Sequence, residues 1–175
     1  RAVQRSGAVT PLPKANNPAD ISYRYRNLSY TLDEYLDRRR ITGLLVIKNG
    51  QVVAERYRYG RQPDARFISF SMAKSVTSLL VGIAHSKGLI ASLDDPAQQY
   101  AKDLSGSAYG ATPIRALLRM SSGLTFTERY DGNDDIARLS RATATGNPPV
   151  NTVLQSISDR HSPPGEKFTY ASAET

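Results

Sequence analysis

The chain has 175 residues, 39% of them hydrophobic and 22% charged, which is ordinary for a globular protein with one core. Cysteine is absent, so disulfide bonds, a thiol nucleophile and thiolate-bound metals are excluded. The two histidines are too few for a histidine-rich metal cluster. No stretch approaches about 18 apolar residues, so no membrane-spanning helix is predicted. We expect neither a metal nor another cofactor.

The formal net charge is +7, and arginine supplies most of it, including the run Arg38-Arg39-Arg40. These residues are not gathered on one predicted helix, and no nucleic-acid-binding motif accompanies them. We interpret them as a solvated face and expect no nucleic-acid partner. The chain begins with Arg1 and shows no signal peptide, which indicates a processed or trimmed chain or an artificial boundary. The compartment stays open, with a periplasmic or secreted location favoured over the cytoplasm.

Residues 1–40 are predicted to form an irregular arm and a short helix. The first 20 residues are rich in Pro, Gly, Asn and Ala without periodicity. Ser29 or Thr31 could begin a helix that runs through Leu36 to the arginine run. Residues 43–48 and 51–57 are then predicted as strands of a hairpin, because Asn49-Gly50 suits a type I′ turn. The first strand is almost wholly apolar, which indicates a sheet covered on both faces.

The central helix is predicted to follow extended residues 67–70 and to end at Gly88. Helix starts are expected at Asp95-Pro96 and at Thr112-Pro113, the second helix ending near residues 121–124. Residues 125–149 are polar and are interpreted as a long excursion near the mouth of a site. Residues 150–157 form another short helix. The apolar stripe of the central helix consists of Met72, Val76, Leu79, Leu80 and Ile83.

Ser71 and Lys74 lie three positions apart at the start of this helix, so their side chains share one face. A serine becomes nucleophilic when a base takes its proton, and a lysine can be that base if its pKa is lowered. The first turn of a helix supplies positive potential and N–H groups that can face an oxyanion. Chance alone gives roughly 0.6 Ser-x-x-Lys pairs in this composition, so the motif by itself is weak.

A histidine-based triad is the first alternative. His85 lies on the same helix roughly 21 Å from Ser71, which is too far for a base. His161 is free to approach, but no Gly-x-Ser-x-Gly elbow surrounds any serine. A second alternative, a pair of carboxylates at Asp94-Asp95 or Asp134-Asp135, is more simply explained by helix caps or loops.

Tyr170-Ala171-Ser172 is a further candidate, because a phenol beside a cationic lysine loses its proton more easily and can exchange it with a serine. Pro163-Pro164 would stiffen the preceding loop. Tyr25-Arg26-Asn27 has a similar pattern, but it precedes the serine in an arginine-rich segment, and we set it aside.

In their order, these motifs resemble the serine β-lactamase and penicillin-binding-protein superfamily. More narrowly, they are similar to class C-like esterases and 6-aminohexanoate-dimer hydrolases. Ser172 departs from the Asn of the Tyr-x-Asn motif of such β-lactamases, which favours the esterase or amidase branch. The matching segments are 70–75, 88–90, 93–96, 117–124 and 164–172.

The resemblance implies that Ser71 is the acylated nucleophile, that Lys74 is its base and that Tyr170 shuttles the proton. The Ser71 amide would be one oxyanion donor, and Ser172 would bind Lys74 or the substrate. It also implies an α/β (α+β sandwich) fold, a β-lactamase-like antiparallel sheet flanked by helices. Only the N-terminal strands and the helical region would be present, because no Lys/His-x-Gly strand follows Tyr170.

We therefore expect residues 41–175 to be the N-terminal half of such a domain, partnered by the remaining half, either in the same polypeptide or as a separate chain. This piece alone should expose the apolar faces of strand 44–47 and of the central helix. The expected function is a serine hydrolase that cleaves a small ester or amide through an acyl-enzyme. The alternatives are a penicillin-binding D-alanyl carboxypeptidase or β-lactamase and, from another class, a non-catalytic penicillin-recognising sensor or binding domain.

Overall fold

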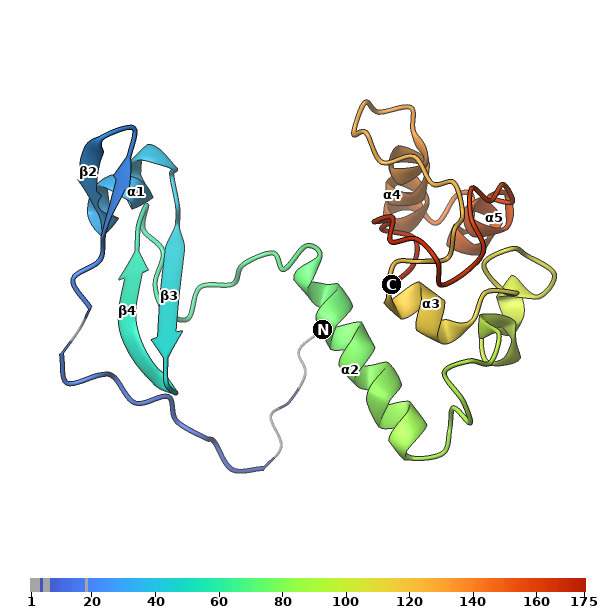
Figure 1. Cartoon of the computed structure of the whole chain (residues 1–175), viewed down its shortest axis with the longest axis horizontal. Coiled ribbons are helices and arrows are strands. Elements are labelled where there is room, and N and C mark those ends of the chain that lie inside the picture. The colour runs from blue at the N-terminus through green and yellow to red at the C-terminus, as the bar shows by residue number, and fades with distance from the viewer. Residues whose placement is uncertain (1–3, 5–6, 18) are drawn as a thin grey trace. The chain divides into compact units, whose positions relative to one another are not determined.

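The computed structural model describes residues 4, 7–17 and 19–175, and it divides into two compact units, residues 1–68 and 69–175 (Figure 1). Parts of the predicted N-terminal arm, at residues 1–3, 5–6 and 18, lie outside the described residues.

The first unit contains the predicted hairpin. Strands β3 (Gly43–Lys48) and β4 (Gln51–Tyr57) pair antiparallel, with a register shift between Val46 and Ile47. Asn49 and Gly50 between them have φ angles of 52° and 74°, as a type I′ turn requires, so this prediction is confirmed.

The arm runs beside the outer edge of β4. The Val52 amide donates a hydrogen bond to the Pro13 carbonyl at 2.8 Å, and the Ala15 amide donates to the Val52 carbonyl at 2.9 Å. These bonds use the edge of β4 that faces away from β3. In β3, Leu45 and Ile47 remain 49% and 46% exposed, so the described residues leave much of this apolar strand uncovered.

A second hairpin was not predicted from the sequence. Strands β1 (Ser22–Tyr25) and β2 (Leu28–Thr31) pair antiparallel, and both turn residues, Arg26 and Asn27, have positive φ. The helix prediction at this point is correct for Thr31, whereas Ser29 lies within β2. Helix α1 (Leu32–Arg38) begins at a capping box in which Thr31 and Glu34 each satisfy the other's backbone N–H.

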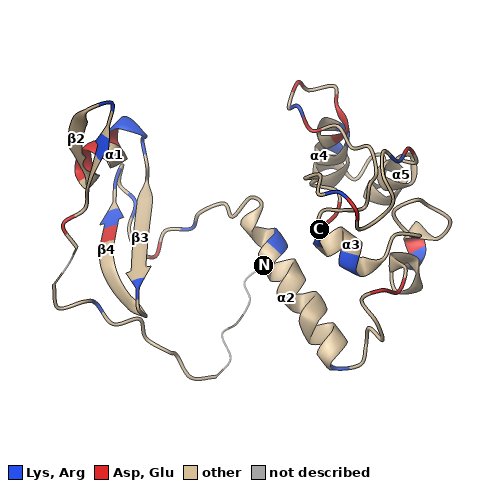
Figure 2. Cartoon of the chain, in the orientation of Figure 1, with Lys and Arg blue, Asp and Glu red and all other residues tan. Residues whose placement is uncertain are grey.

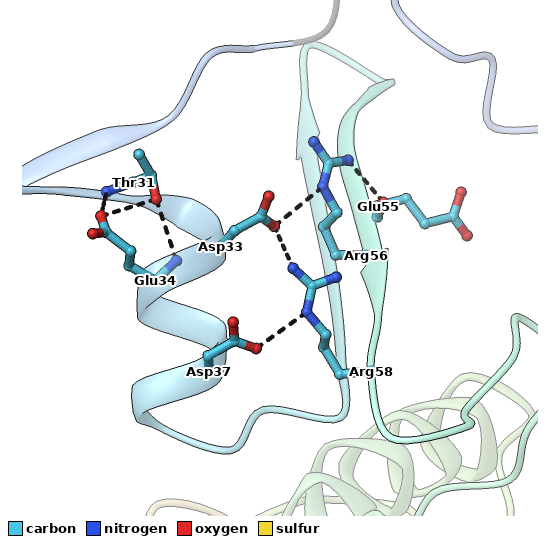
Figure 3. A network of polar contacts seen from close by, with 7 residues as sticks. All are labelled: Thr31, Asp33, Glu34, Asp37, Glu55, Arg56 and Arg58. Carbon is cyan, nitrogen blue, oxygen red and sulfur yellow. Dashed lines mark hydrogen bonds and ion pairs between the residues drawn. The ribbon is translucent and has the colours of Figure 1, made fainter.

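Charged side chains connect α1 to β4 and to the residue that follows it (Figure 3). Arg58 contacts Asp33 at 2.5 Å and Asp37 at 3.4 Å, and Arg56 lies 3.9 Å from Asp33. Two of the early arginines therefore have acidic partners within this unit. Exposed ion pairs of this kind each stabilise a fold by only about 0–1 kcal/mol, so the network orients α1 more than it stabilises it.

The second unit opens with helix α2 (Met72–Ser86), close to the predicted bounds. It ends as expected in a left-handed glycine, Gly88, whose φ is 72°. Lys74 is its one residue with a full charge, and most of the helix is uncharged in Figure 2. The predicted apolar stripe is exposed, as we expect for this piece alone, and Leu79 is 68% exposed. Among the described residues, no helix combines the length and apolar character needed to cross a membrane.

Two helix starts differ from their predictions. At Asp95-Pro96 only a short 3-10 turn forms, η1 (Ala97–Gln99), preceded by Pro96 in an extended conformation. Asp95 does not cap it, because its carboxylate accepts hydrogen bonds from the Tyr100 phenol and the Ser92 amide instead. Helix α3 (Ile114–Leu118) likewise begins after Pro113, and the Thr112 hydroxyl donates to the Ala108 carbonyl rather than capping the helix. A second 3-10 turn, η2 (Lys102–Leu104), lies between η1 and α3.

The interpretation of residues 125–149 as a long excursion is wrong in its second half. Helix α4 (Asp135–Thr145) occupies it, capped by Asp134 and ended by Gly146 in the left-handed conformation. Its mean polarity hid a narrow apolar face that includes the buried Leu139 and Ala142. Helix α5 (Val150–Gln155) follows, within the predicted range.

The core of the second unit lies between α4, α5 and loop segments that precede and follow them in the sequence. Tyr109, Leu124, Val153 and Ala171 are each no more than 2% exposed. Ala171 follows Tyr170 in the sequence, so the backbone of the candidate tyrosine is anchored next to this core. The buried cluster is completed by Phe126, Leu139, Ala142 and Ile157.

Candidate active site

The start of α2 places Ser71 at a sharp turn. Phe70 has a φ of 43°, which is unusual for a bulky residue, and its side chain is 79% exposed. Ser71 occupies the N-cap position but has helical backbone angles and makes no side-chain capping bond. Its hydroxyl is therefore free of the helix. Strained backbone of this kind is often found at functional sites.

Lys74 lies in the first turn of α2, where its amide donates to the Ser71 carbonyl at 3.1 Å. Unlike the exposed apolar side chains of the same helix, Lys74 is half-buried. Its Nζ lies 5.8 Å from the centre of the Tyr170 ring, within the range of a cation–π contact. Lys74 also lines an open cavity of about 410 Å³ together with Ser75, Ser78, Leu79, Leu118, Met120 and Thr175.

Tyr170 reaches Ser71 from the other end of the unit. Its phenol donates a hydrogen bond of 2.7 Å to the Ser71 Oγ. The residues on either side of Tyr170 hold its loop in place, because the Thr169 amide donates to the Met120 carbonyl at 2.8 Å and Ala171 is buried. An aromatic side chain that is 42% exposed is thus held by a well-anchored backbone.

A buried carboxylate anchors the chain beyond the tyrosine. Glu174 accepts hydrogen bonds from the Ser122 hydroxyl at 2.7 Å and from the Ser122 amide at 3.3 Å. Burial raises the pKa of Glu174 against the effect of these bonds. Ser122 belongs to the predicted segment 117–124, which therefore contacts the tyrosine loop.

Ser172 is the fourth predicted site residue, and it faces Glu128. Its amide and its hydroxyl donate to the two oxygens of that carboxylate at 2.9 and 2.8 Å. The Tyr130 phenol donates to the same carboxylate at 2.5 Å. Neither Glu128 nor Tyr130 was predicted as a site residue, because a single glutamate in a polar segment carries no spacing signal. Only the placement of residues 125–149 near a site mouth pointed toward them.

The pKa of Tyr170 is lowered from its ordinary value. The largest cause is the Ser71 hydroxyl, which can donate a hydrogen bond to the phenolate once Tyr170 has lost its proton, and partial burial opposes it. Hydrogen bonding by Ser172 and the positive charge of Lys74 lower the pKa further, whereas the negative charge of Glu128 raises it. Each predicted site residue thus acts on the same phenol.

The alternative groupings have ordinary structural contacts. His85 Nδ1 donates to the Ile90 carbonyl at 2.8 Å, and His161 Nε2 lies 3.3 Å from the Thr169 hydroxyl. Asp94 pairs with Arg115 at 2.7 Å, and Asp134 caps α4. Within the described part of the chain, no three His, Asp or Glu side chains are grouped so that they could hold a metal ion.

Comparison with known proteins gives the family. The Beta-lactamase family matches residues 28–174, which is most of the chain. The chain belongs to the beta-lactamase family. The predicted resemblance is thereby confirmed, and so is the β-lactamase-like fold class.

A 6-aminohexanoate-dimer hydrolase from Paenarthrobacter ureafaciens is 30% identical to this beta-lactamase family chain over 132 residues, which are 74% of this chain and 32% of that protein. A solved structure from Bacillus anthracis, of a protein provisionally named 6-aminohexanoate-dimer hydrolase, has the same fold with a TM-score of 0.78 and 22% identity. That match covers 95% of this chain and 46% of the other. The chain therefore spans about a third of the curated relative and under half of the solved one.

Proposed function

We propose that this beta-lactamase family chain carries the nucleophilic half of a serine hydrolase that cleaves a small ester or amide through an acyl-enzyme. The observation that supports it most is the 2.7 Å hydrogen bond between the Tyr170 phenol and the Ser71 Oγ, with Lys74 beside the phenol. A relative whose name describes hydrolysis of a 6-aminohexanoate dimer, an amide, agrees with this reaction class.

In the proposed acylation, the Ser71 Oγ attacks the carbonyl carbon of the substrate, and its proton passes to the Lys74–Tyr170 pair. Tyr170 then returns a proton to the leaving alcohol or amine as the carbonyl–leaving-group bond breaks. In the second half, water attacks the carbonyl carbon of the acyl-enzyme and the same pair takes its proton. The bond between that carbon and the Ser71 Oγ then breaks, and the oxygen takes a proton back from the pair. The Ser71 amide makes no hydrogen bond to any described residue, so it is free to stabilise the oxyanion.

We further propose that additional strands and loops of the same domain cover the exposed faces, either in one polypeptide or as a separate chain. The supporting observations are the exposure of Leu79, Leu80 and Ile83 on α2 and of Leu45 and Ile47 on β3. Exposed apolar surface of this extent is characteristic of an interface. A periplasmic or secreted location remains a prediction, which cell fractionation would test.

The test is hydrolysis of a p-nitrophenyl ester by the full-length protein and its variants. Ser71→Ala should abolish turnover while the circular dichroism spectrum stays unchanged, and Lys74→Ala should cost about as much, because members of one catalytic unit are not additive. Near-normal turnover by either folded variant would rule out this mechanism. A burst of one equivalent without steady turnover would favour the non-catalytic sensor instead.

A further inference from the structure

The contacts between Glu128 and Ser172 lie outside the predicted catalytic set. The two residues are 44 positions apart, and both are half-buried. The Glu128 carboxylate receives the amide and the hydroxyl of Ser172 and, in addition, the phenol of Tyr130. A carboxylate that accepts two hydrogen bonds from one residue fixes both the backbone and the side chain of that residue.

The direction of the Ser172 hydroxyl matters, because a hydroxyl has one proton and two acceptor lone pairs. Here the proton is directed at Glu128. The lone pairs of the Ser172 Oγ are therefore left for donors on its other sides. While Glu128 is ionised, Ser172 acts toward the site as an acceptor.

The charge of Glu128 also reaches the site. Burial raises the pKa of this carboxyl most strongly, but hydrogen bonds from Tyr130 and Ser172 and the charge of Lys74 outweigh burial and hold the pKa below its ordinary value. Glu128 is consequently ionised at neutral pH. The titratable groups that face it are Lys74, Tyr130 and Tyr170, and its negative charge raises the pKa of Tyr170.

We propose that Glu128 is a positioning residue for the acylation step, which fixes Ser172 as a hydrogen-bond acceptor and places a negative charge beside the Lys74–Tyr170 pair. The inference rests on the proposed function, because it assumes that this pair takes the proton of Ser71. A negative charge beside the pair disfavours loss of its proton, so Glu128 sets the lowest pH at which Ser71 is activated.

The experiment measures the second-order rate at which a fluorophosphonate labels Ser71 in the full-length protein, from about pH 5 to about pH 10. In this reaction the Ser71 Oγ bonds to phosphorus, fluoride leaves with the electron pair of the P–F bond, and the serine proton passes to the Lys74–Tyr170 pair. Glu128→Gln preserves size and one acceptor oxygen but removes the charge. We expect the acidic limb of its profile, the range in which the labelling rate falls as pH falls, to shift to lower pH.

The matched control is Asp131→Asn, which removes the same charge from the same loop. Asp131 pairs with Arg129 at 3.0 Å and contacts no predicted site residue, so its acidic limb should stay where it is in the wild type. The second readout is a double-mutant cycle. If Glu128 acts through Ser172, the rate on the pH plateau for Glu128→Gln with Ser172→Ala should equal that of Ser172→Ala alone.

The inference would be overturned if the acidic limb of the labelling rate did not move in Glu128→Gln, or if it moved equally in Asp131→Asn. It would also be overturned if the rate losses of Glu128→Gln and Ser172→Ala were additive in the double variant. If Glu128→Gln fails to fold, Glu128→Asp retains the charge: a limb at the wild-type pH supports the inference, and a shifted limb opposes it. Labelling of Ser71→Ala at the wild-type rate would instead overturn the proposed function itself, so the two failures are distinguishable.

Discussion

The phenolic oxygen of Tyr170 lies 2.7 Å from the Oγ of Ser71, although 99 positions separate the two residues in the sequence. One residue sits at the first turn of α2 and the other on a loop packed against the core of the same unit. Their hydrogen bond is also the largest cause of the lowered pKa of Tyr170. A phenol that shares a proton with a serine is suited to carry that proton onward.

Replacing this phenol should therefore slow the chemistry without unfolding the protein. We expect Tyr170→Phe to reduce kcat for a p-nitrophenyl ester by about 10²–10⁴-fold, the usual contribution of a general acid–base group. The ring is 42% exposed and its loop is held by backbone bonds, so the thermal midpoint should change little. The measurement is steady-state kinetics combined with a thermal melt.

The control for that variant is Tyr100→Phe in the same unit. Tyr100 donates its phenol to Asp95 at 2.6 Å and contacts no predicted site residue, so kcat should remain at the wild-type value. Full activity of Tyr170→Phe would mean that the phenol near Ser71 only packs.

Much of the fold followed from local signals that the tertiary structure leaves intact. Asn49-Gly50 determines its turn through backbone conformation alone, and α2 runs unbroken to Ser86, two residues before Gly88. The errors have two causes, a side chain with two possible partners and a helix whose apolar face is narrow. Asp95 was expected to cap a helix but binds Tyr100, and the polar surface of α4 concealed the few apolar residues that pack inward.

The candidate site could be predicted only where its residues form a motif. Ser71 and Lys74 are neighbours on a helix, whereas Tyr170 is a candidate only for the chemistry of its phenol, and its role comes from resemblance to a family. No rule of spacing places Tyr170 against Ser71, because the contact depends on how loops 120–125 and 159–169 pair. Glu128 has no sequence signature at all, since it is recognised only by the donors that surround it.

Gly123 lies at a close approach of these two loops, where its carbonyl accepts a hydrogen bond from the His161 amide at 2.8 Å. Its φ is 76°, and a Cβ added to it would lie 1.9 Å from the Ser162 carbonyl oxygen. Gly123→Ala should therefore destabilise the protein by more than about 2 kcal/mol, since backbone strain adds to a clash with main chain that has to move. Urea unfolding would measure the loss.

Gly106→Ala is the matched control for this prediction. Gly106 also has a positive φ, 80°, but an added Cβ would meet nothing within 4 Å. Its cost should be limited to backbone strain of about 1–2 kcal/mol. Equal losses in the two variants would contradict the role assigned to the close approach at Ser162.

Tyr109 offers a stabilising substitution. Its side chain is 2% exposed, and its hydroxyl has no hydrogen-bond partner among the described residues. Leaving a buried hydroxyl unpaired costs about 1–3 kcal/mol, so Tyr109→Phe should raise the free energy of unfolding by about 1 kcal/mol or more. Tyr109→Ala should instead destabilise by about 3–5 kcal/mol through the cavity that it leaves. A loss of stability in Tyr109→Phe would show that the hydroxyl is satisfied in solution.

The last prediction concerns Glu174 and pH. The carboxyl is 7% exposed, and burial raises its pKa above the ordinary value of 4.5, although the Ser122 bonds oppose the shift. A carboxyl whose pKa rises on folding binds its proton more tightly in the folded state. Its contribution to stability is therefore complete below the unfolded pKa and is lost as pH rises through the folded pKa.

Glu174→Gln cannot titrate, so the free energy of unfolding of the wild type should fall relative to that of this variant as pH rises from about 4 to about 8. In the protein that keeps Glu174, Ser122→Ala should make the free energy of unfolding fall more steeply with pH, because it removes the hydroxyl donor that favours the charged carboxylate. Urea midpoints across this range measure both effects. Parallel stability curves for the wild type and Glu174→Gln would mean that the carboxyl has the same pKa in the folded and unfolded chains, and hence that water reaches it despite its burial.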